Sequence, residues 1–372
     1  MIKVGIECES IEQDTYGIAK VILKTLEELS RRPELVKTHR FYLYFKSKIP
    51  DYPFLNNPMF VKEVIWQPFS YRSFVFYYYV FLPIRLWFAG LNVMYFPNYM
   101  LPIIFWGKSL VLLTDDIYYE MRSPDQRPHH RLAYWVFGNW AAKFATKIMA
   151  ISETSKRELV RLFKINPNRI AVNHLGVDTP KVITKPYTLT PNPYILFVGQ
   201  AFPRRHLKET LLVFEKLAPE FPSLDFIFVG TDKYSPPIID SLIKKINERL
   251  GSERVTHKQR VSDDELNSLY RDASAVTYIS DREAFGLPPL EALAHGSVPV
   301  VTDNALSYEL FGDSAFMVPK PITIESITVK LRSALTDTEK RGNIQNTTAG
   351  VVGWFSWKSH VDRLLNEVDI LT

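Results

Sequence analysis

Strand-like and helix-like stretches alternate along almost the whole chain of 372 residues, and no other feature restricts its fold as strongly. Strands need short runs of β-branched and aromatic residues, whereas helices show apolar residues at intervals of three and four. Alternation of the two predicts an α/β fold with parallel sheets covered on both faces. The first half is predicted to hold strands at 2–8, 40–46, 60–67, 92–96, 109–114, 147–151 and 169–174, and helices at 17–32, about 72–89, 127–145 and 152–163.

A second alternating set follows a stretch rich in Thr, Pro and Lys at 182–193, which we interpret as a linker. The chain length also favours two domains. Two doubly wound domains in tandem are expected to leave a cleft at the carboxyl ends of their strands, where ligands bind. The second set is predicted to hold strands at 194–198, 224–229, 254–257, 275–280, 298–302 and 315–318, and helices at 207–220, 237–250, 263–272, 288–295, 324–336 and 357–371, with a capping box at Ser262 and Glu265.

The cysteine content and the distribution of charge limit the kinds of site and partner that this chain can have. The single cysteine, Cys8, excludes an intrachain disulfide and argues against a zinc site built on cysteines. The N-terminus reads directly as a strand, so a cytoplasmic location is expected. Residues 1–180 carry 23 Lys and Arg against 16 Asp and Glu, whereas 181–372 carry 22 against 24. A basic first half indicates an anionic membrane, a phosphorylated lipid, a nucleic acid or simply a solvated surface. No nucleic-acid-binding module accompanies the charge, so we expect no nucleic acid partner.

One uncharged stretch between Arg85 and Lys108 is interrupted by glycine, asparagine and proline, which argues against a membrane-spanning helix. The segment 74–84 is strongly aromatic but too short to span a bilayer. Two interpretations remain open for it: a helix that lies on a membrane surface, and a helix buried in the first domain.

Two glutamates, Glu283 and Glu291, stand eight positions apart around a predicted turn. Gly286 and Pro288 are suited to open a helix, which places Glu283 in the preceding loop and Glu291 inside the helix. Backbone amides at a helix start bind phosphate. The segment therefore offers an anion site with a carboxylate on each side, as a nucleotide diphosphate-sugar requires.

A second candidate site follows the predicted strand 194–198. Gly199 leaves the strand, and Arg204 and Arg205 precede the next helix. Guanidinium groups suit a diphosphate because they bind bidentately and keep their charge. A pair of surface arginines without function is the alternative, and the nearby glutamate motif favours the diphosphate site.

These motifs resemble the retaining family 4 glycosyltransferases of the GT-B fold (glycosyl transferases group 1), in particular their mannosyltransferases. The resemblance covers nearly the whole second half, where residues 194–207 read YILFVGQAFPRRHL, 269–273 read LYRDA, 283–294 read EAFGLPPLEALA and 298–302 read VPVVT. Weaker similarity in the first half is carried by 17–20 (GIAK), 95–102 (YFPNYMLP), 151–156 (ISETSK), 174–178 (HLGVD) and 355–357 (FSW). It implies an acceptor-side Rossmann-like domain at 1–182, onto which a helix of about 355–372 packs back, and a nucleotide-sugar-binding domain at 190–354.

The resemblance also implies roles for single residues. Glu283 faces the donor sugar, Glu291 binds the ribose hydroxyls, and Arg204 and Arg205 neutralise the diphosphate. Further donor contacts are implied for Phe285, Gly199 and the amides of Gly286 and Leu287, and Gly17 is implied to let its loop approach the donor phosphates or the acceptor closely.

Two positions depart from the family pattern. Arg205 stands where the family usually has lysine, which keeps the charge but changes the geometry. Asp115 stands where a histidine is common; a carboxylate accepts a hydroxyl proton but cannot donate as imidazole does. Asp115 is therefore a candidate catalytic residue, and capping of the following turn by Asp115 and Asp116 is the alternative.

The function expected from the resemblance is transfer of a sugar, with retention, from a nucleotide diphosphate-sugar to an acceptor hydroxyl. GDP-mannose is favoured as the donor, and a lipid-linked or polysaccharide intermediate at the inner face of the cell membrane as the acceptor. No metal or other cofactor is expected, because no Asp-x-Asp motif or histidine cluster occurs. The alternatives are a UDP-sugar-dependent transferase, a GT-B epimerase or phosphorylase, and a non-catalytic GT-B binding protein.

Overall fold

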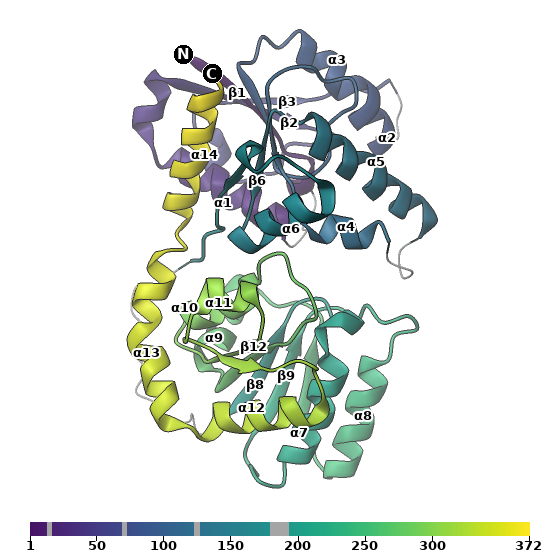
Figure 1. Ribbon diagram of the computed structural model, residues 1–372, viewed down its shortest axis with the longest axis vertical. Coiled ribbons are helices and arrows are strands. Elements are labelled where there is room, and N and C mark those ends of the chain that lie inside the picture. Colours follow the sequence, from purple (N-terminus) through teal and green to yellow (C-terminus); the bar gives the residue numbers. More distant parts are fainter. Residues whose placement is uncertain (13–16, 69–72, 123–126, 179–192) are drawn as a thin grey trace. The chain divides into compact units, whose positions relative to one another are not determined.

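The computed structural model describes residues 1–12, 17–68, 73–122, 127–178 and 193–372 (Figure 1). The chain divides into two compact units, the first formed by Met1–Gly176 with Trp357–Thr372 and the second by Val177–Ser356. The predicted linker at 182–193 lies outside the described residues except for its last position. Each unit has its own parallel sheet, of seven and six strands respectively, which confirms the predicted α/β class.

The sheet of the first unit has the strand order β3-β2-β1-β4-β5-β6-β7, and every described pairing in it is parallel. Strands β4 and β5 are buried along their whole length, as expected for a sheet covered on both faces. The chain order reverses at β1, which pairs with β2 on one side and β4 on the other. The strands are β1 (Ile2–Glu7), β2 (His39–Phe45), β3 (Phe60–Val64), β4 (Val93–Phe96), β5 (Ser109–Leu112), β6 (Lys147–Ala150) and β7 (Ile170–Val172).

The helices of this unit connect the strands and cover both faces of the sheet (Figure 1). They are α1 (Ile18–Ser30), α2 (Phe74–Phe76), α3 (Leu82–Trp87), α4 (Asp116–Glu120), α5 (Pro128–Phe144), α6 (Glu153–Phe163) and α14 (Trp357–Leu371). Short 3-10 turns lie at Glu9–Ile11, Pro33–Lys37, Pro53–Asn56 and Pro167–Arg169.

The aromatic segment at 74–87 is one helical run with a π-helical turn, η4 (Tyr77–Phe81), between α2 and α3. Pro83 has no amide hydrogen, so a regular α-helical bonding pattern cannot continue through this point. Tyr77, Tyr78 and Leu82 are completely buried, whereas Phe74, Val75 and Phe76 are exposed. The segment is thus neither wholly buried nor detached from the core.

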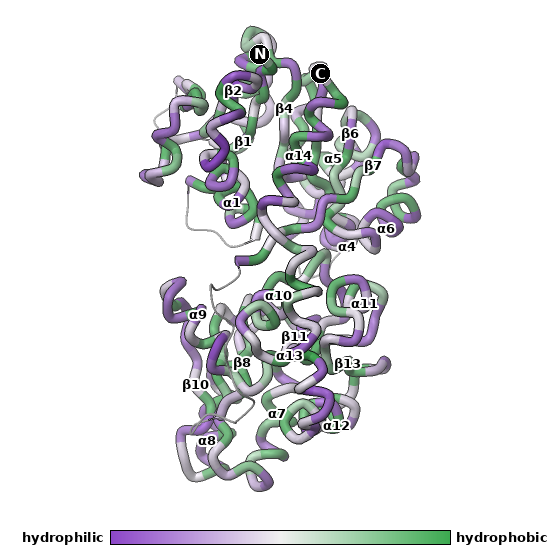
Figure 2. The backbone as a smooth tube through the Cα atoms, turned by 90° about the vertical axis from the view of Figure 1, so that its left-hand side faces the viewer, coloured by the Kyte–Doolittle hydropathy of each residue, from purple (hydrophilic) through white to green (hydrophobic). Residues whose placement is uncertain are grey.

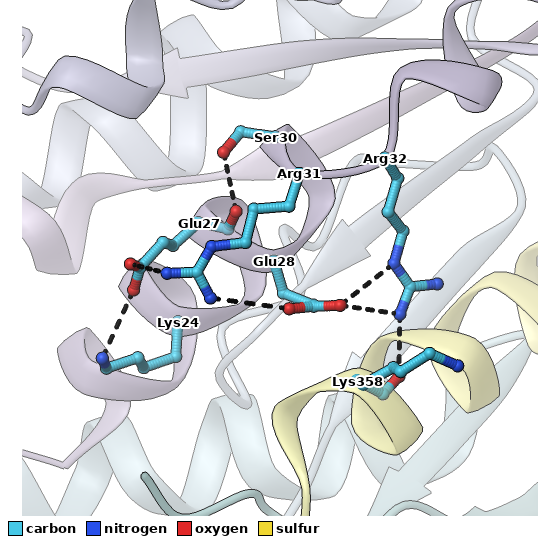
Figure 3. A network of polar contacts seen from close by, with 7 residues as sticks. All are labelled: Lys24, Glu27, Glu28, Ser30, Arg31, Arg32 and Lys358. Atoms are coloured by element: carbon cyan, nitrogen blue, oxygen red, sulfur yellow. Dashed lines mark hydrogen bonds and ion pairs between the residues drawn. The ribbon is translucent and has the colours of Figure 1, made fainter. Parts of the chain in front are cut away.

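The last helix, α14, packs on α1 of the first unit through a polar network (Figure 3). Arg32, just after α1, donates from Nη2 to the carbonyl of Lys358 at 2.9 Å and to Glu28 at 3.1 Å. Its Nη1 lies 2.5 Å from a carboxylate oxygen of Asp362. Arg32 is largely shielded from solvent, so these contacts fix α14 more firmly than exposed ion pairs would.

Close backbone packing also holds α14 in place. A β-carbon added to Gly176 would lie 2.4 Å from the amide nitrogen of Trp357, so only glycine permits this approach. His360 on α14 is buried, and its Nδ1 donates to the carbonyl of His174 at 3.0 Å. Burial lowers the pKa of His360 to about 4, so the ring is neutral near pH 7.

The sheet of the second unit has the order β10-β9-β8-β11-β12-β13, again parallel throughout the described pairings. Its strands are β8 (Tyr194–Val198), β9 (Asp225–Val229), β10 (Val255–Lys258), β11 (Ala275–Tyr278), β12 (Pro299–Thr302) and β13 (Phe316–Val318). Its helices are α7 (Leu207–Leu217), α8 (Ile239–Leu250), α9 (Asp263–Asp272), α10 (Leu287–Ala294), α11 (Ala305–Phe311), α12 (Ile324–Thr336) and α13 (Thr338–Gly353). Figure 2 shows hydrophobic stretches along the strands and hydrophilic ones on helices such as α8 and α12.

Within the described residues, all thirteen strands occur where the sequence predicts them, with ends that differ by a few residues. In the same part of the chain the sequence does not predict three helices: α4, α11 and α13. The first two are shorter than two and a half turns, and α13 contains three glycines and no clear apolar face. The capping box at Ser262 is only half formed. Ser262 accepts from the amide of Glu265, but that carboxylate contacts Lys258 at 2.6 Å.

The buried neutral His360 predicts acid lability of the first unit. The folded-state pKa lies below the usual 6.5, so this group stabilises the fold above pH 6.5 and the contribution is lost as pH falls towards 4. In His360→Asn the side-chain amide can still donate to His174, but the group does not titrate. We expect the free energy of unfolding of the wild type to fall by about 3 kcal/mol more than that of the variant between pH 6.5 and 4. Urea titrations at both pH values test this; parallel pH profiles would contradict it.

Candidate functional site

The predicted diphosphate residues lie at the carboxyl ends of β8 and β11, two neighbouring strands in the middle of the second sheet. The chain order reverses here, because β9 and β10 lie beyond β8 whereas β12 and β13 lie beyond β11. Open parallel sheets bind ligands at such reversals. Gly199 ends β8 with φ +129°, and a β-carbon on Gly230, after β9, would lie 1.9 Å from the Gly199 carbonyl oxygen. Glycine at 230 is therefore required for the two loops to come this close, and the positive φ of Gly199 favours glycine there as well.

Arg205 and Glu283 form a two-point ion pair across these loops. Arg205 Nε donates to Glu283 Oε1 at 2.6 Å and Nη2 donates to Oε2 at 2.9 Å. Its Nη1 donates to the Gln200 carbonyl at 3.0 Å, so the guanidinium is fixed from three directions. The guanidinium carbon also lies 5.0 Å from the ring centre of Tyr278, whose pKa is raised by burial. Two residues predicted from separate motifs therefore act on one another directly.

Arg204 lies on the same loop, with its guanidinium carbon 4.4 Å from the ring centre of Phe202. Its carbonyl accepts from the amide of Asp281 at 2.9 Å, which joins the β8 and β11 loops through the backbone. His206 follows in the left-handed region with φ 46° and contacts Asp281 Oδ1 at 3.0 Å. Hydrogen bonds to Glu209, which has the larger effect, and to Asp281 raise the pKa of His206. Sequence reasoning missed His206 and Asp281, although both adjoin predicted motifs.

Helix α10 begins after Gly286, which adopts φ +107°. Its first turn contains Pro288 and Pro289, which have no amide hydrogen, so the amides of Gly286 and Leu287 are the donors that this helix start can offer an anion. Glu283, Phe285 and Gly286 line one pocket together with residues that follow β11 and β12.

Glu291 lies deeper, within α10, and is buried. Its Oε2 accepts a hydrogen bond of 2.9 Å from the hydroxyl of Tyr270, which is itself buried. Burial raises the pKa of Tyr270, so the phenol keeps its proton and remains a donor. Tyr270 belongs to the LYRDA motif at 269–273, but the motif alone does not predict that its hydroxyl binds Glu291.

The candidate residues of the first unit, Gly17 and Asp115, lie near the carboxyl edge of its own sheet. Gly17 precedes α1 with φ +75°, and a β-carbon added to it would meet no atom within 4 Å, so backbone conformation alone favours glycine there. Asp115 occupies the N-cap position of α4, but its carboxylate makes no capping bond. Thr114 donates to Asp116 instead. Capping of α4 therefore does not account for Asp115.

A buried carboxyl group, Glu7, lies at the end of β1 and was not predicted. It accepts from the amide of Glu9 at 2.7 Å, from Asn98 at 3.0 Å and from the Tyr77 hydroxyl at 3.3 Å. Burial raises the pKa of Glu7 to about 8. These bonds join the end of β1 to the π-helical turn and to the segment after β4.

Comparison with known proteins first defines the class. The crystal structure of WaaG, a glycosyltransferase involved in lipopolysaccharide biosynthesis, matches with a TM-score of 0.72 over all of both chains at 16% identity. The two doubly wound units therefore form the GT-B fold of glycosyltransferases.

Sequence comparison then shows which family the second unit is similar to. Residues 182–350, a little under half of the chain, match the model of the glycosyl transferases group 1, a family of retaining hexosyltransferases. The chain is 27% identical over 263 residues to O-antigen chain mannosyltransferase B of Escherichia coli, covering 67% of each chain. It is 25% identical over 205 residues to a GDP-mannose:cellobiosyl-diphosphopolyprenol alpha-mannosyltransferase of Xanthomonas oryzae pv. oryzae, covering 55% of this chain and 53% of that protein. The match thus spans only about half of the second relative.

Two further kinds of feature do not occur in the described part of the chain. Among the residues that the structure describes, no group of three or more His, Cys, Asp or Glu side chains is placed to hold a metal ion. Within the same described ranges, no helix has the length and hydrophobicity needed to cross a bilayer.

The ion pair predicts strong coupling between Arg205 and Glu283. Both side chains are mostly buried, so removal of either leaves the other charge without its partner. We expect Arg205→Ala and Glu283→Ala each to destabilise the second unit, and the double variant to be less unstable than the sum by about 1–3 kcal/mol. Arg205→Lys should recover only part of the loss, because an ammonium cannot form the two-point contact. Additive effects in denaturant titrations would contradict this coupling.

Proposed function

We propose that the protein transfers mannose from GDP-mannose, with retention, to a hydroxyl group of a lipid-linked or polysaccharide intermediate. One observation carries the proposal: the two-point Arg205–Glu283 pair lies at the chain reversal of the second sheet, beside the start of α10. This position is where a parallel sheet binds a nucleotide, and Arg204, Arg205 and the amides at the start of α10 are donors suited to a diphosphate.

In the proposed reaction the bond between the sugar and the diphosphate breaks, and negative charge grows on the leaving diphosphate. Arg204, Arg205 and the amides of Gly286 and Leu287 stabilise that charge. Glu283 holds the guanidinium of Arg205 in place before the donor binds, so little reorganisation is needed during the reaction. The charge of the diphosphate is met by these groups without a metal ion.

Glu291 is proposed to bind the ribose hydroxyls of the donor. Its carboxylate is buried and oriented by Tyr270, and a carboxylate can accept from two neighbouring hydroxyls. Gly199 and Phe285 would complete the donor site of the second unit.

The first unit is proposed to bind the acceptor. Asp115 can accept the proton of an acceptor hydroxyl, and its place after β5, near the carboxyl edge of a parallel sheet, supports this role. Gly17, at the N-cap of α1, has no side chain that would keep the acceptor away from the backbone. Because the first half is basic and aromatic, we further propose that the protein contacts an anionic membrane peripherally at its cytoplasmic face.

The choice of donor is supported by relatives whose names state mannosyl transfer, one of them with GDP-mannose as donor and a diphosphopolyprenol as acceptor. The GLPPLE segment at 286–291 supports the same choice through its resemblance to mannosyltransferases.

A thermal-shift screen of GDP-mannose, GDP, UDP-glucose and UDP tests the donor. A ligand that binds only the folded state raises the melting temperature, so GDP-mannose should give the largest rise. Arg204→Ala should lower kcat/KM for transfer by about 10²- to 10³-fold while the unliganded melting temperature stays near that of the wild type. Arg332→Ala, at an exposed arginine of the same unit, is the matched control and should not affect turnover. A response to UDP-sugars alone would replace the donor assignment.

Ribose binding predicts a different kinetic pattern for the Tyr270–Glu291 pair. Glu291→Gln should weaken the binding of GDP as well as of GDP-mannose, because the contact does not involve the sugar. Tyr270→Phe keeps the buried ring and removes the hydroxyl that orients Glu291, so we expect a smaller loss in the same direction, of about three- to tenfold. Calorimetric titration with GDP measures both, and unchanged GDP affinity in Glu291→Gln would remove the ribose assignment.

A further inference from the structure

An exposed apolar stripe runs along the outer side of the helical segment at 74–87 in the first unit. Phe76, Ile84, Trp87 and Phe88 recur at helical intervals, and all four are exposed. Their neighbours on the inner side, including Tyr77 and Leu82, are completely buried, so this face does not belong to the core.

Two tryptophans from other segments extend the stripe at its two ends. Trp66, after β3, lies 6.2 Å from the ring of Phe81, which in turn lies 6.5 Å from Phe76. Trp106 lies 5.9 Å from Trp87. Trp66 is 69% exposed, and Trp106 is 82% exposed. We call these six residues the aromatic stripe: Trp66, Phe76, Ile84, Trp87, Phe88 and Trp106.

Basic residues outnumber acidic ones in the segments that carry the aromatic stripe. No Asp or Glu occurs from residue 64 to residue 114, whereas Arg85 and Lys108 lie in this range. The adjacent acid, Glu63, is paired with Arg85 at 2.6 Å, and Lys108 is exposed two residues after Trp106.

Helix α5 is also basic and aromatic. It contacts η4, because Tyr79 packs on Phe137 with their ring centres 5.0 Å apart, and Figure 1 shows it next to α2. No acidic residue occurs from 127 to 152, and α5 exposes Trp135 together with Arg131 and Lys143.

We propose that the aromatic stripe inserts into the headgroup region of an anionic phospholipid bilayer. Indole and phenyl rings are favoured at that depth, while Lys108, two residues after Trp106, and the exposed basic residues of α5 add positive charge to this unit that attracts the lipid charge. The excess of basic over acidic residues in these segments favours this partner over a protein surface, which would need acidic patches or a matched apolar face. The proposal assigns residues to the membrane contact of the proposed function. It rests on the proposed function only for the reason why the protein would bind a membrane.

Flotation with vesicles tests the proposal without any sugar transfer. The wild type should float with vesicles of phosphatidylcholine and phosphatidylglycerol in equal amounts, and only weakly with phosphatidylcholine alone. Phe88→Ser/Trp106→Ser should reduce the partition coefficient at least about tenfold. Lys108→Gln should reduce it about fivefold and make it less sensitive to salt.

Trp354→Ser is the matched control, because Trp354 is a 73% exposed tryptophan of the second unit, and this variant should float like the wild type. Phe88→Ser alone serves as a second variant if the double variant melts at a lower temperature. Equal flotation of wild type and stripe variants, or equal binding to neutral vesicles, would overturn the proposal. So would a dimer in sedimentation velocity that the stripe variants convert to monomer without a change in flotation.

The GDP-mannose thermal shift, measured on the same preparations, separates this inference from the proposed function. A normal donor response without flotation would reject the aromatic stripe alone. Flotation without a donor response would uphold the stripe and reject the proposed donor.

Discussion

The ion pair between Arg205 and Glu283 is the interaction on which the candidate site depends. It joins the loops after β8 and β11, the two strands at which the chain order of the second sheet reverses. Because Nε and Nη2 of Arg205 both bind the Glu283 carboxylate, the guanidinium cannot rotate away from the site. The ion pair therefore fixes both the geometry of the two loops and the position of the positive charge. The backbone bond from Asp281 to Arg204 reinforces the same junction, and Gly199 leaves room for Arg205, because a β-carbon there would lie 3.2 Å from Nη1 of its guanidinium. The site is thus organised by the second unit itself.

Much of the fold could be predicted from the sequence because the physical signals are local. Strands such as β4, β5 and β12 are short apolar runs between turn residues, and α1 shows apolar positions at regular helical intervals. Helix α13 escaped prediction because glycines and polar residues hide its periodicity, and its stability comes from packing against α10. The half-formed box at Ser262 shows a related limit, since Lys258 from a neighbouring strand competes for Glu265.

The candidate site was predicted in part for a similar reason. Arg205, Glu283 and Gly286 belong to motifs with characteristic spacing, and their pairing follows from the sheet order. Tyr270, His206 and Glu7 gain their importance from partners 21, 75 and 91 residues away, which no local pattern reveals. The chemistry of such groups depends on their burial, which the residue type alone does not reveal; the raised pKa of Glu7 is an example.

The position of α14 has a consequence for the order of folding. This helix belongs to the first unit, yet the ribosome makes it only after the entire second unit has been synthesised. The face of α1 that receives Lys358 and Asp362 therefore stays uncovered throughout that time, and the second unit can form its sheet first. A nascent chain arrested before residue 357 should accordingly hold a folded second unit beside an incomplete first unit that a chaperone would still recognise.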